Sequence, residues 1–318
     1  MTEKALITGG SGMLGNALSR VLTEQQVPFE APSSKRRDFR DHGQTKACLL
    51  DASPDVVYHL AARVGGLVAN SEGLADFYHD NAVMNATILN GCVKAWVPRV
   101  VSVLSTCVYP DAPFVKWPLS EEQLHAGPPH PSNFGYAFAK RMLDVYTRAI
   151  RKQHGLKYVT VIPNNIYGEH DNFDLINGHV IPSLMRRIWE ARLFNQPTVT
   201  IWGNGKQLRE FTYAEDIARI LVVVSKEYDD DMPLNIGVSE EQSIGDVARL
   251  LAKYLGYTGE LVFDESAPVG QFRKPSTNVR LLSMTSWKAT DYTPFAEGLK
   301  KTCQWFMENY PNVRGVNR

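Results

Sequence analysis

The sequence predicts an α/β protein with a doubly wound parallel Rossmann sheet and a smaller mixed α/β domain at its C-terminal end. Three observations predict this. A short apolar run, a glycine turn and an amphipathic segment open the chain, apolar strands then alternate with helical patterns up to residue 168, and the pattern loosens afterwards. We expect a Rossmann domain over residues 1–168, to which about residues 207–228 return, and a second domain mainly over residues 169–318. The length of 318 residues is sufficient for both.

The composition limits the classes of partner. Lys and Arg total 34, as do Asp and Glu, so the formal net charge is zero, which argues against a surface for nucleic acid. Cys48, Cys92, Cys107 and Cys303 are scattered without the spacing of a metal site, as is typical of reduced thiols. No apolar run reaches membrane-spanning length. The sequence therefore predicts a cytoplasmic protein with no metal and no membrane association.

The first predicted strand, residues 4–8, ends in a turn that contains Gly9, Gly12 and Gly15, and an amphipathic helix should follow. Glycines let the backbone turn tightly and let a pyrophosphate approach the helix N-terminus, where free N–H groups favour anions. Glycines also mark ordinary turns, but these have the strand-to-helix setting of a dinucleotide site. We expect them to bind a dinucleotide cofactor together with Met13.

A second strand is predicted near residues 27–32. NAD-binding folds usually place an acid about twenty residues past the glycines, on the ribose 2′-hydroxyl. Here the chain has hydroxyls and cations, which suit a 2′-phosphate, so NADP(H) is the expected cofactor. Ser34, Lys35 and Arg36 are the candidates for the phosphate, and Asp38 for the adenine side. A solvated charge run is the alternative, and Glu30 is a possible acid if the strand register differs.

Three more strands, at residues 54–62, 99–104 and 157–163, complete the predicted sheet, with a long helix at residues 75–96. Ligands of such sheets bind beyond the carboxyl ends of the strands. We therefore expect the residues at these ends to lie beside the cofactor, namely Leu60, Ala61, Ala62, Ser105, Cys107, Pro163, Asn165 and Ile166.

Tyr136 and Lys140 stand four positions apart and share one face of a predicted helix. A lysine ammonium beside a phenol favours the phenolate, so Tyr136 could pass a proton nearer neutral pH than a free phenol does. Such pairs also occur on ordinary solvated helices. The glycine turn upstream favours the catalytic interpretation.

Beyond residue 168 the elements are shorter and mixed. Residues 169–178 are polar and loop-like. We expect helices at residues 179–191, 214–224 and 243–255, and short strands at residues 199–202 and 210–213. This part should cover the carboxyl edge of the sheet and hold the substrate.

Several separated motifs together resemble the extended short-chain dehydrogenase/reductase family: the glycine turn, Ser105, Tyr136 with Lys140, and Asn164–Gly168. Within that family the chain is most similar to enzymes that act on a GDP-bound keto sugar. The similarity extends over nearly the whole chain and includes Ala61–Gly66, Leu104–Pro110, Gly168–Phe173, His179–Pro182, Trp202–Gly205, Asp264 and Gly270–Lys274.

The resemblance implies an enzyme that inverts carbons 3 and 5 of GDP-4-keto-6-deoxy-D-mannose and then reduces carbon 4 with NADPH. Both inverted carbons flank the ketone, so losing a proton gives an enolate with its charge on the carbon-4 oxygen. The resemblance implies Cys107 as the base and His179 as the acid. Without it, a cysteine after a strand is more often a packing residue, and a histidine before a helix more often a cap.

For the reduction, the resemblance implies that Tyr136 donates a proton to the carbon-4 oxygen and that Ser105 hydrogen-bonds the same oxygen. Lys140 would lower the pKa of Tyr136 and hold the nicotinamide ribose, and His179 would also contact the cofactor. Ser105 could instead cap backbone groups at the strand end.

The substrate diphosphate needs cations, and Arg187, Arg209 and Lys274 are the candidates. Trp202 could pack beside the sugar nucleotide, and Asn165 should touch the sugar. Arg187 and Arg209 are equally compatible with surface charges. The resemblance also implies a homodimer formed by helices near residues 75–96 and 136–154.

Two alternatives stay open. The first is another nucleotide-sugar enzyme on this scaffold, a 4,6-dehydratase or a 4-epimerase. Against it, Cys107 and Val108 stand where the dehydratases have an Asp-Glu pair, and the basic run after the second strand argues against the NAD of simple 4-epimerases. The second is a non-catalytic NADP-binding protein, which would typically lack the Tyr136–Lys140 pair.

Overall fold

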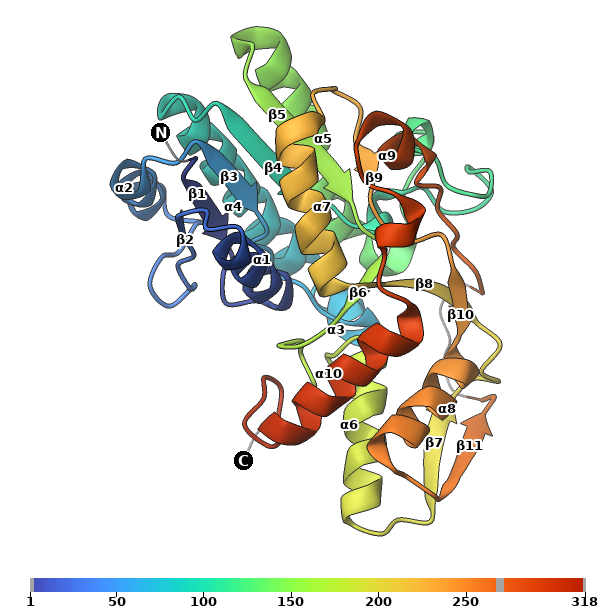
Figure 1. The fold of residues 1–318 in the computed structure, drawn as a ribbon. Helices are drawn as coiled ribbons and strands as arrows, with labels where there is room; N and C mark the ends of the chain where they lie inside the picture. The colour runs from blue at the N-terminus through green and yellow to red at the C-terminus, as the bar shows by residue number, and fades with distance from the viewer. Residues whose placement is uncertain (1–2, 267–271, 317–318) are drawn as a thin grey trace.

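A computed structural model describes residues 3–266 and 272–316. Its main sheet has six strands, all parallel, in the order β2-β1-β3-β4-β5-β9 (Figure 1). The strands are β1 (Ala5–Thr8), β2 (Phe29–Glu30), β3 (Val56–His59), β4 (Arg99–Val103), β5 (Lys157–Ile162) and β9 (Leu234–Asn235). This confirms the predicted Rossmann sheet. The strand order reverses between β1 and β3, which is where ligands bind in such sheets.

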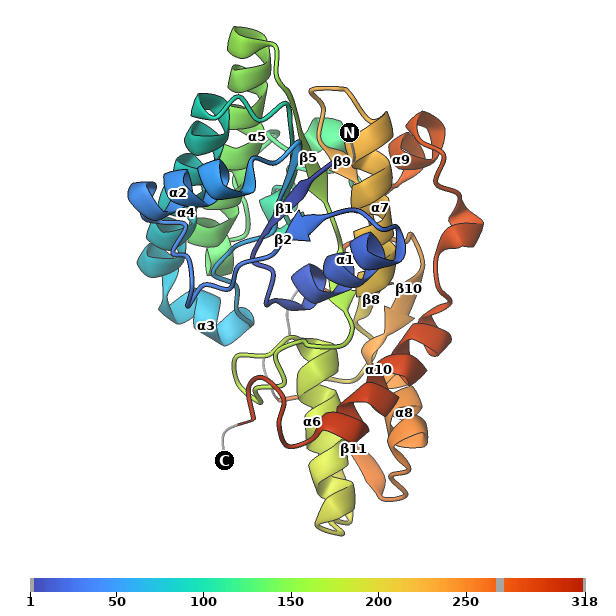
Figure 2. The same ribbon diagram turned by 60° about the vertical axis from the view of Figure 1, so that its left-hand side comes forward.

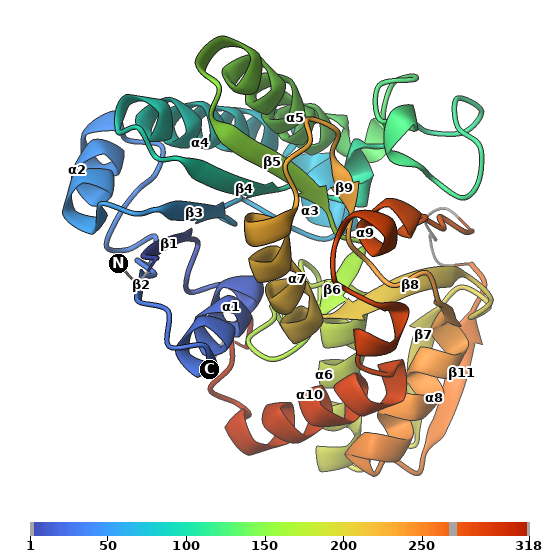
Figure 3. The same cartoon turned by 45° about the horizontal axis from the view of Figure 1, so that its top comes forward.

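Helices cover both faces of this sheet, as Figure 3 shows. On one face lie α1 (Met13–Glu24) and α7 (Ala214–Glu227), and on the other lie α2 (His42–Ala52), α4 (Leu74–Lys94) and α5 (Phe134–His154). Each layer contributes an apolar stripe to a buried cluster against the sheet, because residues three and four apart share one helix face. Examples are Leu18, Val21, Ile217 and Leu221 on the first face, and Leu49, Ile88 and Leu143 on the second.

The C-terminal elements form a second cluster below the carboxyl edge of the sheet (Figure 2). It contains a β10-β8-β6 sheet and a parallel β11-β7 pair. Its elements are β6 (Asn165–Tyr167), α6 (Val180–Leu193), β7 (Thr198–Trp202), β8 (Leu208–Tyr213), β10 (Glu241–Ser243), α8 (Ile244–Leu255), β11 (Glu260–Asp264) and α10 (Phe295–Asn309). The predicted helices and strands of this region are confirmed, whereas the sequence alone does not predict β11 or α10.

The chain crosses between the two regions more than once. After β8 it returns to the main sheet as α7 and β9, and then leaves it again for β10. Two short elements, α3 (Leu67–Glu72) and α9 (Val279–Met284), lie in the connections. The division of the chain at residue 168 stays a prediction. Within the described ranges, no helix combines the length and apolarity needed to cross a bilayer.

A buried polar chain joins the elements that frame the site. The Ala61 amide donates to Thr8 Oγ1 at 3.2 Å, and Thr8 Oγ1 lies 3.0 Å from His59 Nδ1. His59 Nε2 lies 3.0 Å from Asn85 Oδ1, and Asn85 Nδ2 donates to the Ala139 carbonyl at 2.9 Å. Burial lowers the pKa of His59 to about 3, so the ring is neutral. The amide oxygen can only accept, so Nε2 carries the proton and Thr8 donates to Nδ1.

Candidate active site

A cavity of about 1170 Å³ lies at the carboxyl edge of the main sheet, between the sheet and the C-terminal elements. Most of the predicted site residues line it: Gly9, Gly12, Met13, Gly15, Ser34, Asp38, Leu60, Ala61, Ala62, Ser105, Cys107, Tyr136, Lys140, Pro163, Asn165, Ile166, His179, Arg187, Trp202 and Arg209. Lys35, Arg36 and Lys274 are described by the structure but are not part of this wall. The segments that the sequence assigns to one ligand site therefore do converge.

The glycine turn leaves room for a ligand beside the backbone. Gly9 has φ +77°, a conformation that side chains rarely adopt, and a Cβ there would stand 2.9 Å from the Ala61 backbone. A Cβ on Gly15 would collide with the Gly9 carbonyl. Gly12 has no side chain with which to cap α1, so the first amides of the helix are available to an anion. This geometry fits the pyrophosphate of a dinucleotide.

The three cations of the basic run after β2 differ in their surroundings. Lys35 and Arg36 are exposed, whereas Arg37 lines the cavity and pairs with Asp51 at 2.9 Å. The run forms a tight turn in which the Arg37 amide donates to the Ser33 carbonyl. Successive side chains of such a turn point in different directions. Contact of Lys35 or Arg36 with a 2′-phosphate stays a prediction.

An ion-pair network that the sequence does not reveal follows this turn. Arg40 pairs with Asp38 and Asp80, each at 2.9 Å, and Asp80 pairs with Arg63 at 2.8 Å. Hydrogen bonds from Arg40 hold the pKa of Asp38 below its ordinary value. All four residues line the cavity. No local pattern could have identified the network, because its members are up to 42 residues apart in the sequence.

The end of β4 presents Ser105 and Cys107 on a 3₁₀ turn over Thr106–Val108. Ser105 Oγ accepts from the Cys107 amide at 3.3 Å, so the serine does cap backbone, as the alternative interpretation holds. Its hydroxyl proton can still be donated to a ligand, so capping the backbone and hydrogen-bonding a substrate oxygen are compatible roles for Ser105.

Tyr136 and Lys140 come from the first turns of α5 and are both buried. Burial raises the pKa of Tyr136, and the nearby charge of Cys107 raises it further. Lys140 Nζ donates to the Val103 carbonyl at 2.8 Å, and burial lowers the pKa of Lys140 to about 8. The expected lowering of the Tyr136 pKa by Lys140 is therefore not a property of this structure, because the ammonium faces the end of β4.

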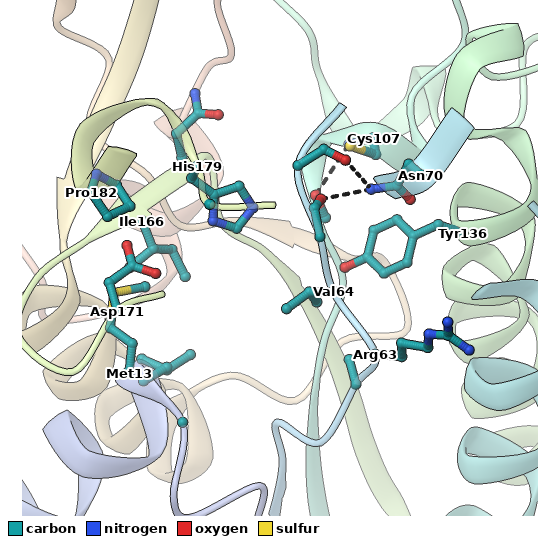
Figure 4. Close-up of a pocket in the computed structure, with 18 of the residues that line it drawn as sticks. Met13, Arg63, Val64, Asn70, Cys107, Tyr136, Ile166, Asp171, His179 and Pro182 are labelled. Atoms are coloured by element: carbon teal, nitrogen blue, oxygen red, sulfur yellow. Dashed lines mark hydrogen bonds between the residues drawn. The ribbon is translucent and has the colours of Figure 1, made fainter. Parts of the chain in front are cut away.

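His179 stands immediately before α6, on the wall opposite Cys107 and Tyr136 (Figure 4). Asp171 and Ile166 are on the His179 side, and Asn70 lies beside Cys107 (Figure 4). Asn70 Nδ2 donates to the carbonyls of Gly65 and Gly66, at 2.6 and 3.0 Å. A ring placed in this space would have an imidazole on one side and a thiol on the other.

The three basic side chains predicted to bind the substrate diphosphate differ in their surroundings. Arg187 donates to the Thr200 carbonyl at 2.9 Å, and its guanidinium carbon lies 5.8 Å from the centroid of the Trp202 indole. Arg209 donates to the Leu208 carbonyl at 2.7 Å. Burial lowers the pKa of Lys274, and the charge of Cys107 opposes this effect, so the lysine lies within electrostatic reach of the thiol. Gly270 and Gln271, which belong to the same motif, lie outside the described residues.

A buried carboxyl group, Glu210, holds the strand-end asparagines. Glu210 accepts from Asn164 Nδ2 at 3.3 Å, and from the amide and hydroxyl of Ser276 at 2.9 and 2.6 Å. Asn165 Nδ2 donates to the Glu210 carbonyl at 2.8 Å. These bonds connect β6, β8 and the segment that follows Lys274. The sequence does not indicate Glu210, because a single acid in a strand resembles a surface residue.

Comparison with known proteins agrees with this geometry. Residues 5–237 match the model of the NAD dependent epimerase/dehydratase family. GDP-L-fucose synthase of Dictyostelium discoideum is 40% identical over 314 residues, which cover 97% of this chain and 97% of the relative. GDP-L-fucose synthase of Escherichia coli (strain K12) is 34% identical, with 98% and 99% covered. The crystal structure of a GDP-L-fucose synthetase from Naegleria fowleri bound to NADP superposes with a TM-score of 0.91 at 39% identity, covering 99% of this chain and 96% of that one.

Glu210 should make the stability of the fold depend on pH. Burial raises its pKa from 4.5 to about 7. A carboxyl group whose pKa is higher in the folded protein stabilises the fold below pH 4.5, and this contribution is lost as pH rises through 7. Between pH 5 and 8, the wild-type free energy of unfolding should therefore fall by about 1–3 kcal/mol more than that of Glu210→Gln. Urea unfolding of both proteins at each pH measures this free energy. Glu227, an exposed acid that also accepts from a serine amide and hydroxyl, gives the control Glu227→Gln. Equal pH slopes for the wild type and Glu210→Gln would refute the prediction.

Proposed function

Because the chain belongs to the NAD dependent epimerase/dehydratase family, we propose that it converts GDP-4-keto-6-deoxy-D-mannose to GDP-L-fucose. It inverts carbons 3 and 5 and then reduces carbon 4 with NADPH. The observation that carries this proposal is one pocket with Cys107 and His179 on opposite walls, Ser105 at the end of β4 and Tyr136 on α5. Near full-length similarity to GDP-L-fucose synthases and to an NADP-bound synthetase supports it.

In the inversions, the thiolate of Cys107 removes a proton from the carbon beside the ketone, and His179 returns a proton on the other face. The two groups suit opposite roles because they face each other across the cavity. The charge of the enolate gathers on the carbon-4 oxygen, where the hydroxyls of Ser105 and Tyr136 can donate hydrogen bonds. No bond to oxygen breaks, so the hexose keeps its substituents.

In the reduction, bound NADPH supplies a hydride to carbon 4, and Tyr136 gives the proton to the oxygen that it already holds. Burial raises the pKa of Tyr136, so its phenol is protonated near neutral pH and holds the proton that the reduction needs. Burial lowers the pKa of Lys140 to about 8, so its ammonium is present near neutral pH and, once it turns from the Val103 carbonyl, can offset the negative charge that Tyr136 develops. Proton transfer therefore uses the same oxygen site as the inversions.

Recognition of the diphosphate falls to Arg187, Arg209 and Lys274, with Trp202 beside the nucleotide and Asn165 at the sugar. The Arg187 guanidinium lies over the Trp202 ring, and both side chains line the pocket. Lys35 and Arg36 complete the contact to the 2′-phosphate through the turn that holds Arg37.

We also propose a homodimer through α4 and α5 and a cytoplasmic location. Large apolar side chains stay exposed on these two helices, among them Tyr78, Phe138 and Val145. Exposed groups of this kind favour burial against a second copy. The four cysteines are unpaired, which suits a reducing compartment. Localisation of a fluorescent-protein fusion of the chain to an oxidising compartment would contradict the proposed cytoplasmic location.

The substrate test uses the purified full chain. NADPH oxidation, followed by absorbance, should require GDP-4-keto-6-deoxy-D-mannose, and the product should be GDP-L-fucose by mass and NMR. The same assay with a UDP-bound 4-keto sugar is the control and should show no turnover. Turnover of the UDP sugar alone would reject the proposed substrate, and NADPH binding without any turnover would favour a non-catalytic role.

The two halves of the reaction should separate in two variants. Cys107→Ser should lower solvent-deuterium incorporation at carbons 3 and 5 by about 10²–10⁴-fold, because it removes the base, while NADPH still binds. Tyr136→Phe should lower NADPH oxidation by a similar factor, because it removes the proton donor, and should keep part of the exchange. Each variant serves as the other's control for folding. Wild-type exchange in Cys107→Ser, or wild-type reduction in Tyr136→Phe, would remove that residue from its role.

The dimer is tested at Val145, which is 58% exposed on α5. Val145→Glu should place a charge in the proposed interface, and sedimentation velocity should show a species near the 35.6 kDa chain mass instead of twice that value. Leu193→Glu, an equivalent change at an exposed position of α6, should stay dimeric. A wild-type protein that sediments as a monomer would contradict the proposal outright.

A further inference from the structure

Glu210 is a buried acid of β8 that the mechanism above does not use, and it is only 2% exposed. Its neighbours Arg209 and Phe211 line the cavity, whereas Glu210 does not, because side chains alternate across a strand. A carboxyl group in such a place costs free energy unless its oxygens are hydrogen-bonded. The partners of the carboxyl group therefore indicate what this residue does.

The carboxyl group of Glu210 holds a segment, residues 272–277, that lies outside the helices and strands. Oε1 accepts from the Ser276 amide at 2.9 Å, and Oε2 accepts from the Ser276 hydroxyl at 2.6 Å. A hydroxyl can donate to a carboxylate or accept from a carboxylic acid, so this contact persists in both forms of the acid. Ser276 is buried and follows Lys274, one of the predicted diphosphate cations, by two residues. Glu210 therefore fixes the backbone that carries this lysine.

The 272–277 segment is also held at its other end by β8. The Leu208 amide and Arg209 Nη1 both donate to the Phe272 carbonyl, at 2.9 and 3.2 Å. Farther along the segment, the Leu119 amide donates to the Pro275 carbonyl at 2.9 Å. The segment is thus fixed at both ends, and the guanidinium of a second predicted diphosphate cation supplies one of the bonds.

Glu210 also contacts β6. Oε2 accepts from Asn164 Nδ2 at 3.3 Å, and the Glu210 carbonyl accepts from Asn165 Nδ2 at 2.8 Å. Asn165 lines the cavity and is the residue expected at the sugar. One residue of β8 therefore joins the segments that carry three predicted substrate contacts, Asn165, Arg209 and Lys274.

We propose that Glu210 is a positioning residue for the substrate diphosphate: its carboxyl group fixes the 272–277 segment against β8, so that Lys274 and Arg209 bind the same diphosphate. The proposal rests on the proposed function only in taking a GDP-linked sugar as the ligand. Two cations close together repel each other, so a segment without this anchor would move away from Arg209 when no ligand is bound. A lysine that is already in place binds the ligand more tightly, because less conformational entropy is lost on binding.

The first experiment measures the binding of GDP, GMP and NADPH to the full chain by calorimetry. In Glu210→Ala, the Kd for GDP should rise about tenfold or more, because a charge-assisted contact to the second phosphate is lost. The Kd values for GMP and NADPH should change by less than about threefold. Glu210→Gln keeps an acceptor for the Ser276 amide and a partner for its hydroxyl, so its Kd for GDP should also stay within about threefold of the wild type. Equal losses for GDP and GMP, as general damage to the fold would give, would overturn the proposal.

Two further variants keep this test decisive if Glu210→Ala is unstable. Ser276→Ala removes the hydroxyl from the other side of the same contact and should raise the Kd for GDP about threefold, with GMP binding unchanged. Glu227→Ala removes an exposed acid that also accepts from a serine amide and hydroxyl, those of Ser286, and should keep the wild-type affinities. Wild-type GDP affinity in Ser276→Ala and in whichever Glu210 variant folds would contradict the positioning role.

The second experiment measures steady-state NADPH oxidation. In Glu210→Ala, the KM for GDP-4-keto-6-deoxy-D-mannose should rise about tenfold while kcat falls by less than about threefold, because Cys107, Tyr136 and His179 stand on other elements. A lower kcat at an unchanged KM would refute the positioning role and leave the proposed function intact. If UDP binds in place of GDP and Glu210→Ala weakens it in the same way, the proposed substrate is wrong and the positioning role stands.

Discussion

The architecture of the site depends on one buried imidazole. His59 is neutral because its burial disfavours the charged form, so one ring nitrogen must accept and the other must donate. The acceptor holds Thr8, the residue before the glycine turn, and the donor holds Asn85 on α4, which in turn holds the Ala139 carbonyl on α5. In this series of hydrogen bonds each group has a fixed role as donor or acceptor. The glycine turn and the helix that carries Tyr136 therefore cannot shift independently.

The main sheet can be predicted from the sequence, whereas the hydrogen bonds that fix the geometry of the site cannot. Strands buried on both faces are continuous apolar runs, and a glycine turn before a helix is a local pattern, so both are visible in a single sequence. A hydrogen bond between Asn85 and Ala139 leaves no local trace, because each residue alone is compatible with many partners. The same holds for the pairing of Arg40 with Asp80 and for the three bonds that Glu210 accepts.

Within the site, the sequence indicates which residues take part better than it indicates where their side chains point. The family resemblance indicates Cys107 and His179, and the strand end and helix start at which they stand determine where their backbones lie. A run of three cations does not reveal in the sequence which of them lines the cavity. In the structure Arg37 lines it, and the contact of Lys35 and Arg36 with a 2′-phosphate stays a prediction. The sequence does not indicate that Asp171 is buried, because its neighbours are polar and its burial depends on tertiary packing.

The electrostatics of the pocket indicate how one site can serve two reactions. Burial keeps Tyr136 protonated, whereas Lys140, whose pKa is lowered to about 8, is still mostly an ammonium near neutral pH. A tyrosine in its phenol form can donate a hydrogen bond to an enolate oxygen, which a phenolate cannot do. The same phenol must later give up its proton, and a nearby lysine makes that loss easier only if it turns away from the Val103 carbonyl toward the tyrosine. A tyrosine ionised from the start would suit neither step. The raised pKa of Tyr136 is therefore a requirement of the first reaction, and the lysine's reorientation would be the condition for the second.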